Sequence, residues 1–105
     1  MRCSRNDVVL LPIPFTDLSS NKVRPAIVVG HGTFSGDLFV VPVTSQLANA
    51  DFTLGSWRAA GLNVPSGVKS QLCTVEDGLV RKIVGRLAAA DVDLLEQHLR
   101  TWLCL

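Results

Sequence analysis

Along most of the chain, apolar residues fall into short blocks that turn-forming residues separate. The runs 26–29 and 38–43 are rich in β-branched residues, which is typical of buried strands. Pro12 and Pro14 end the first block, because proline donates no hydrogen bond to a sheet. The pattern predicts six strands, at residues 7–11, 24–29, 37–43, 51–57, 68–75 and 79–87.

The final segment has a helical period, with apolar residues recurring every three or four positions at Val92, Leu95, Leu99 and Trp102. This spacing predicts one amphipathic helix over residues 89–103. Asp91 and Asp93 in its first turn suit the helix dipole, but residues 88–90 offer no capping side chain. Short strands followed by one helix predict a mainly β fold, a small and partly open barrel packed by the helix. Open sheet edges and the apolar end at 102–105 favour a homodimer.

Composition narrows the class of protein. The 105 residues suit one compact domain, residues 1–105, and a hydrophobic content of 48% can build a core. A net charge of +1 gives no overall basic field, so any site for a polyanion has to be local or span a dimer. Three widely spaced cysteines indicate neither a disulfide scaffold nor a zinc site. No apolar run approaches the roughly 20 residues of a membrane span, so we expect a cytoplasmic protein without membrane contact.

Two polar groups stand at the ends of neighbouring predicted strands. Arg24 and Pro25 open the run 26–29, and Thr44 directly follows the run 38–43. If the two strands pair antiparallel, a guanidinium and a hydroxyl meet at one sheet end. A planar cation beside a hydroxyl donor suits a phosphodiester. The polar loop at 15–23 is placed to close over such a site.

Four blocks in order make the sequence similar to the MazF/PemK family of toxin endoribonucleases from bacterial toxin–antitoxin pairs. The blocks are residues 7–17, 22–29, 41–46 and 84–87 with Asp91-Val92 after the last. The chain departs from the family pattern at Asn6, where a glycine is usual, and at Ala88, where a serine usually caps the helix. Both departures concern stability, since asparagine tolerates a positive φ better than most residues.

The resemblance implies an SH3-like barrel with a C-terminal helix, the MazF/CcdB-like toxin fold, in a dimer. It implies metal-independent cleavage of single-stranded RNA at short sequences through attack by the 2′-hydroxyl, with no cofactor. Arg24 and Thr44 match the family's catalytic positions. The implied partner is a small antitoxin whose acidic, disordered tail occupies the RNA groove.

Further residues are candidates for holding the RNA. Ser45 and Gln46 follow Thr44 directly, and Phe15 offers an aromatic face on which a base can stack. Lysines and arginines can line a basic groove, although each alone is commonly a solvated charge. The RNA-binding candidates are Phe15, Thr16, Asp17, Lys22, Ser45, Gln46 and Lys69.

Several alternatives remain open on sequence grounds. Arg24 can be an ordinary surface arginine paired with Asp17, and Thr44 a hydroxyl that only satisfies a turn. His31 is the alternative base because histidine titrates near neutrality, whereas His98 on the helix is expected to be structural. The same fold also hosts toxins that bind DNA gyrase without cutting RNA, and an inactive RNA-binding homologue is a third possibility.

Overall fold

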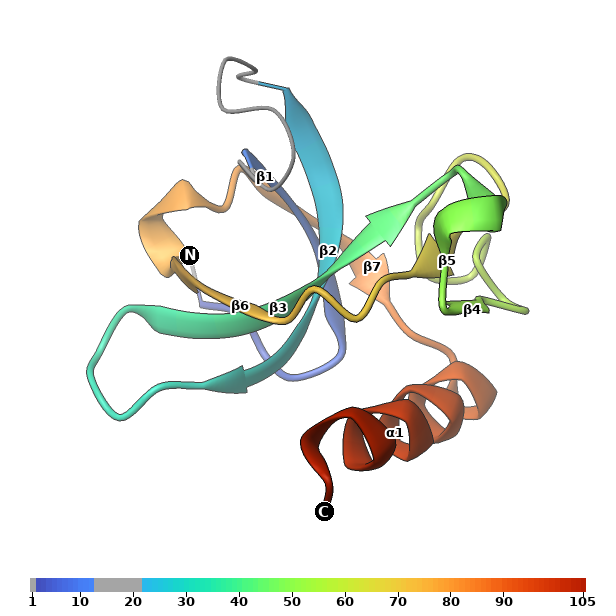
Figure 1. Ribbon diagram of the computed structural model, residues 1–105. Coiled ribbons are helices and arrows are strands. Elements are labelled where there is room, and N and C mark those ends of the chain that lie inside the picture. The colour runs from blue at the N-terminus through green and yellow to red at the C-terminus, as the bar shows by residue number, and fades with distance from the viewer. Residues whose placement is uncertain (1, 13–21) are drawn as a thin grey trace.

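A computed structural model describes residues 2–12 and 22–105 of the chain. One strongly curved antiparallel sheet carries a single helix against one side, α1 (Ala89–Leu103) (Figure 1). The sheet is built from β1 (Asp7–Pro12), β2 (Val23–His31), β3 (Asp37–Thr44), β4 (Phe52–Thr53), β5 (Gly67–Val68), β6 (Cys73–Glu76) and β7 (Lys82–Arg86). Two short 3₁₀ turns, Leu47–Asn49 and Asp77–Leu79, complete the described elements.

The strand order is β4-β5-β3-β2-β1-β7, and β6 also pairs with β3. Within the described ranges no pairing joins β4 to β7, so the barrel is open. In the central ladder Ala26 pairs with Pro42 and Ile27 with Val41. This antiparallel register carries the start of β2 toward the end of β3, so the condition for bringing Arg24 close to Thr44 is met.

Both faces of the central strands are buried, which explains why their sequences are nearly continuous apolar runs. Alternate side chains enter two clusters. The core beneath α1 contains Val8, Ile27, Val41, Val43, Leu54, Ala60, Val68, Leu87, Leu95 and Leu99. The core on the opposite face contains Cys3, Val9, Leu11, Ala26, Val28, Leu38, Val40 and Val80.

The predicted strand over 51–57 is mostly wrong, because only Phe52–Thr53 joins the sheet. After it, the backbone N–H groups of Gly55 and Ser56 donate to the Asp91 carboxylate, at 3.1 and 2.9 Å. These amides therefore bind the first turn of α1 instead of a neighbouring strand. The sequence predicted only that Asp91 interacts with the helix dipole. In the structure Asp91 is buried and also joins the start of α1 to residues 55 and 56.

The predicted strand over 68–75 is interrupted, because two separate strands occupy its ends. Val68 pairs with Val43 and Cys73 with Val40, so five steps along this segment span only three steps along β3. The two extra residues bulge out of the ladder, and the Ser70 N–H donates to Asp51 instead. The predicted strand over 79–87 shortens to β7, since its first residue lies in a 3₁₀ turn.

The helix prediction is confirmed at both ends, and no side chain caps its start at Ala88. Asn6 has φ of 74°, the left-handed conformation for which asparagine is suited. Its backbone N–H donates to Val28, and its carbonyl accepts from Leu87. The Asn6 turn therefore joins β2 to the segment that leads into α1.

Candidate functional site

Arg24 and Thr44 lie together at one end of the β2–β3 ladder. Continuing the register of Ala26 with Pro42 by two residues places Arg24 at the level of Thr44. Both side chains line one pocket of about 250 Å³, with Ser45 beside them. The two residues therefore border the same space at one end of the sheet.

The Thr44 hydroxyl has a defined orientation. Its oxygen accepts a hydrogen bond of 3.0 Å from the backbone N–H of Gln46, in a local turn. The Gln46 side chain is engaged elsewhere, because its Oε1 accepts from the Asn49 amide at 2.9 Å. The hydroxyl hydrogen of Thr44 therefore remains available to donate into the pocket.

The opposite wall of the pocket comes from residues 61–66, a segment that belongs to none of the strands predicted from the sequence. Residues 61–64 and Ser66 face the strand ends, and Leu10, Pro25, Val43 and Val84 supply apolar lining. Asn63 brings a carboxamide to this wall. The available signal was Gly61 at the start of a connection that also contains Asn63, Pro65 and Ser66, but nothing in the sequence shows which strand end such a loop covers.

Arg24 is the one ionisable side chain in the described lining of this pocket. Within the described ranges its guanidinium forms no ion pair or hydrogen bond, and the side chain is exposed. A cation that lines a small pocket and has no partner among the described residues is well suited to bind an anion.

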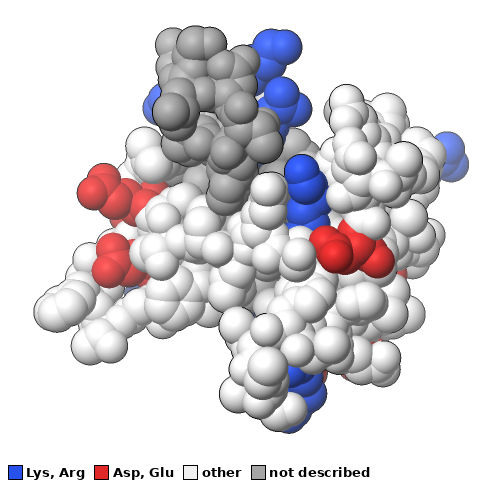
Figure 2. Space-filling view, viewed as in Figure 1, with Lys and Arg blue, Asp and Glu red and all other residues white. Residues whose placement is uncertain are grey.

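Figure 2 shows separate small groups of basic side chains on the face displayed. Lys69 and Lys22 lie outside the pocket lining, although both were candidates for holding RNA. The backbone N–H of Lys69 donates to Pro42 at 3.0 Å, which fixes its chain position near the end of β3. Phe15, Thr16 and Asp17 lie outside the described residues.

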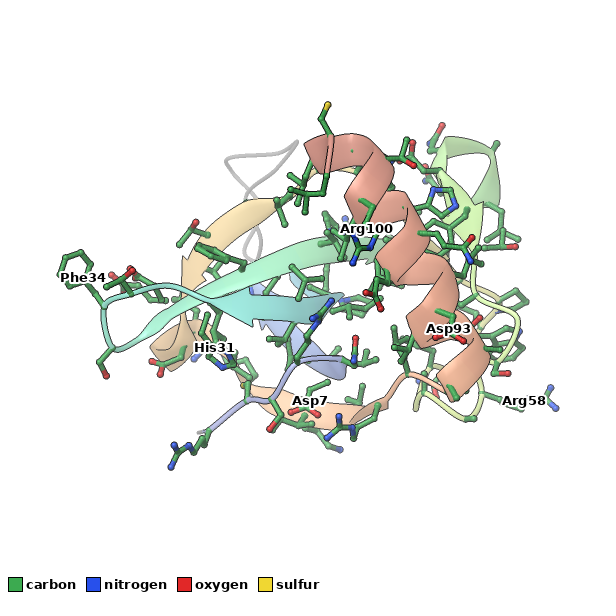
Figure 3. All side chains as sticks on the ribbon, turned by 90° about the horizontal axis from the view of Figure 1, so that it is seen from below. Asp7, His31, Phe34, Arg58, Asp93 and Arg100 are labelled. Atoms are coloured by element: carbon green, nitrogen blue, oxygen red, sulfur yellow. The ribbon has the colours of Figure 1, made fainter. Side chains whose placement is uncertain are left out.

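The two histidines lie away from Arg24 and Thr44. His31 is at the far end of the β2–β3 hairpin, where its Nε2 donates to the Cys3 carbonyl at 2.8 Å (Figure 3). It lines a larger hollow of about 700 Å³, in which the cations Arg2 and Arg5 are offset by carboxylates. His98 stacks on Phe52 with a ring separation of 4.2 Å, as a structural residue does.

The cysteines have no paired or ligating arrangement. Burial, followed by the charge of Asp7, raises the pKa of the Cys3 thiol, and burial raises the pKa of Cys73. All three thiols are free, and only Cys104 is exposed. In the part of the chain that the structure describes, no three His, Cys, Asp or Glu side chains gather closely enough to hold a metal ion.

Comparison with known proteins identifies the family. The profile of the PemK-like, MazF-like toxins of type II toxin–antitoxin systems matches residues 4–103. The chain belongs to this toxin family. Its fold is also similar to a solved structure described as an endoribonuclease in complex with its cognate antitoxin from Mycobacterial species. The TM-score is 0.70 at 15% identity, covering 96% of this chain and 92% of that chain. No curated protein sequence matches the chain.

The structural similarity confirms the mainly β toxin fold with a C-terminal helix. At 15% identity, this similarity is evidence for the fold and not for the function. The family match makes the chain a toxin of a type II toxin–antitoxin system. Among the helices described, none is long and apolar enough to cross a membrane.

Proposed function

We propose that this toxin is a sequence-specific endoribonuclease that cuts single-stranded RNA, without a metal ion, in the pocket at Arg24 and Thr44. The observation that carries the proposal is a solvent-accessible guanidinium beside an oriented hydroxyl in one small pocket. A volume of about 250 Å³ lies just below the roughly 300–1,000 Å³ of ordinary ligand pockets. Such a pocket admits one nucleotide unit of a flexible strand rather than a folded duplex.

The reaction needs charge stabilisation more than an added nucleophile. The ribose 2′-oxygen attacks the adjacent phosphorus, and the bond from phosphorus to the 5′-oxygen of the next nucleotide breaks. The products are a 2′,3′-cyclic phosphate and a free 5′-hydroxyl, as one proton leaves the 2′-oxygen and another reaches the 5′-oxygen. In between, two negative charges gather on the phosphorane oxygens. Donors aimed at that developing charge lower the barrier.

Arg24 serves as the main stabiliser of this charge. A guanidinium donates two parallel hydrogen bonds to phosphate oxygens and keeps its charge at any physiological pH. A pKa above about 12 makes it a poor proton acceptor, so its role is electrostatic. Thr44 donates its hydroxyl hydrogen to the same phosphate, since its oxygen is held by the Gln46 N–H.

Residues around the pocket hold the rest of the strand. Ser45 lines the pocket beside Thr44 and contacts the nucleotide there. Lys22, Gln46 and Lys69 lie outside that lining, and we assign them to the path of the RNA on either side of the cut. We assign Phe15, Thr16 and Asp17, which lie between β1 and β2 in the sequence, to the same path.

The proposal includes the cytoplasm as the place of action and two protein partners. The partners are a second copy of the chain and an antitoxin with an acidic, disordered tail that competes with RNA. The apolar side chain of Leu103 at the end of α1 is 47% exposed, which supports self-association. Sedimentation equilibrium should give twice the 11.3 kDa mass of one chain. A single-chain mass at micromolar concentration would remove the homodimer from the proposal.

The test is incubation of the purified toxin with a long single-stranded RNA in EDTA, followed by mapping of the cut ends. We expect cuts at a recurring short motif, with 2′,3′-cyclic phosphate ends. Arg24→Ala should lower cleavage below detection while circular dichroism shows an intact fold. Arg24→Lys should keep only part of the rate, because an ammonium lacks the bidentate geometry.

A matched pair at Thr44 isolates the hydroxyl. Thr44→Val keeps the side-chain shape and should lose about 10²-fold in rate, whereas Thr44→Ser should stay near the wild type. Arg100→Ala is the control for removing an arginine, because Arg100 lies on α1 and pairs with Glu96 at 3.6 Å. Near-normal cutting by folded Arg24→Ala would refute the assignment. Failure of the folded wild type to cut any RNA would favour the gyrase-binding or inactive-homologue readings, which a gyrase supercoiling assay separates.

A further inference from the structure

The wall opposite Arg24 is held in place by direct contact between two backbones. Gly61 has φ of 90°, and a Cβ added there would overlap the carbonyl oxygen of Val84. A Cβ added to Gly85 would overlap the carbonyl oxygen of Ala60. The turn at 60–61 thus rests on β7 with no side chain between them, which is possible only with glycine on both sides.

Hydrogen bonds stiffen the segment that follows this contact. The Leu62 N–H donates to Trp57 at 3.1 Å, and the Leu54 N–H donates to Ser66 at 2.9 Å. The buried Ser66 hydroxyl donates to the Val64 carbonyl at 2.8 Å. Both ends of the wall are therefore anchored, and the residue between Leu62 and Val64 has a defined place.

Asn63 is that residue, and its carboxamide is uncommitted. The side chain is exposed, lines the pocket and forms no hydrogen bond within residues 2–12 and 22–105. The same pocket lining also contains the aliphatic side chains of Leu10, Leu62 and Val64. A flat base can lie against these aliphatic groups and present its edge to the amide.

We infer that Asn63 is a specificity-determining residue, which binds the edge of the base next to the scissile phosphate. The inference rests on the proposed RNA cleavage at Arg24 and Thr44. A carboxamide offers one donor and one acceptor side by side, so it pairs with a base edge that carries the complementary pair. Single-stranded RNA exposes such edges, because its bases are unpaired.

A change of hydrogen-bonding pattern at this position should change the preferred base. Asn63→Ala removes both the donor and the acceptor, so the preference for one base at one position beside the cut should disappear. A bidentate contact favours the correct base over the others by on the order of ten- to a hundredfold. Asn63→Asp leaves acceptors only and should shift that position toward guanine, whose Watson–Crick edge carries two adjacent donors. The new carboxylate should also slow cutting, because it repels the phosphate.

The experiment is cleavage of a random-sequence single-stranded RNA library in EDTA, with base frequencies counted around every cut. Gln97→Ala is the matched control, since Gln97 is an exposed amide on α1 outside this pocket. A wild type that cuts nothing refutes the proposed function itself. A wild type that cuts, with an unchanged base preference in both Asn63 variants, overturns only the present inference. Complete loss of cutting by folded Asn63→Ala also overturns it, because base choice alone would redistribute cuts.

Discussion

Replacing Asp91 by alanine should destabilise the toxin and loosen the wall of its pocket. The Asp91 carboxylate is 4% exposed and receives the N–H groups of Gly55 and Ser56 at 3.1 and 2.9 Å. These bonds attach the start of α1 to the segment that leads into residues 61–66. No other side chain in the described part of the chain accepts from either amide.

The expected cost follows from the two bonds. A hydrogen bond to a charged group contributes about 1.5–3 kcal/mol to stability. Gly55 is exposed and Ser56 half-buried, so water replaces part of each bond, and the lower value is appropriate. The sum is about 3 kcal/mol, which is large against a typical total of about 5–15 kcal/mol. For a domain of this size it lowers Tm by on the order of 10–20 °C.

Asp93→Ala is the control, because Asp93 lies two residues later on the same helix and is exposed (Figure 3). Its loss should change stability by no more than about 0.5 kcal/mol. Urea denaturation of both variants beside the wild type measures the difference. If Asp91→Ala unfolds within about 1 kcal/mol of Asp93→Ala, the two bonds do not hold the helix to the wall.

Two further predictions concern backbone contact and the thiols. Gly85→Ala should lower the free energy of unfolding by on the order of 1–3 kcal/mol, because its methyl overlaps the Ala60 carbonyl, while Gly78→Ala, with nothing within 4 Å, should be neutral in thermal melts. A thiol reagent should modify the exposed Cys104 first and the buried Cys3 last under native conditions. The folded state raises the pKa of the Cys3 thiol. The contribution of this thiol to the free energy of unfolding is therefore fully present at pH values below the ordinary thiol pKa. That contribution should decline as the pH rises from the ordinary thiol pKa toward the raised pKa of Cys3. Urea denaturation at a series of pH values measures the decline, which should be smaller in Cys3→Ala. Equal reaction rates of the thiols would contradict the assigned burial.

Much of the fold was predictable because its central strands are buried on both faces. Runs such as 26–29 and 38–43 then lack polar interruptions, and the pattern marks them clearly. The helix was equally clear from its spacing. Strand lengths after residue 50 were not, because Asp91 and Asp51 draw the amides of Gly55, Ser56 and Ser70 out of the ladder.

The candidate site also has a part that the sequence predicts and a part that it does not. Arg24 and Thr44 are local features of two neighbouring strands, and antiparallel pairing alone brings their ends together. Asn63 is separated from both in sequence and reaches them through the Gly61–Gly85 contact. A single sequence gives no measure of that contact, since a glycine in a loop looks the same whether it faces solvent or another backbone.

The sequence by itself determined the family, the central strands, the terminal helix and the position of Arg24 and Thr44 at adjoining strand ends, because each depends on local periodicity or on adjacent strands. Only the tertiary structure decided which loop lines the pocket, which amide in that loop has no partner among the described residues, and which carboxylate holds the loop to the helix. Those features depend on contacts between residues far apart in the chain, such as Gly61 with Val84 and Gly55 with Asp91. Such contacts follow from how the strands curve and pack, and a linear pattern does not encode them locally.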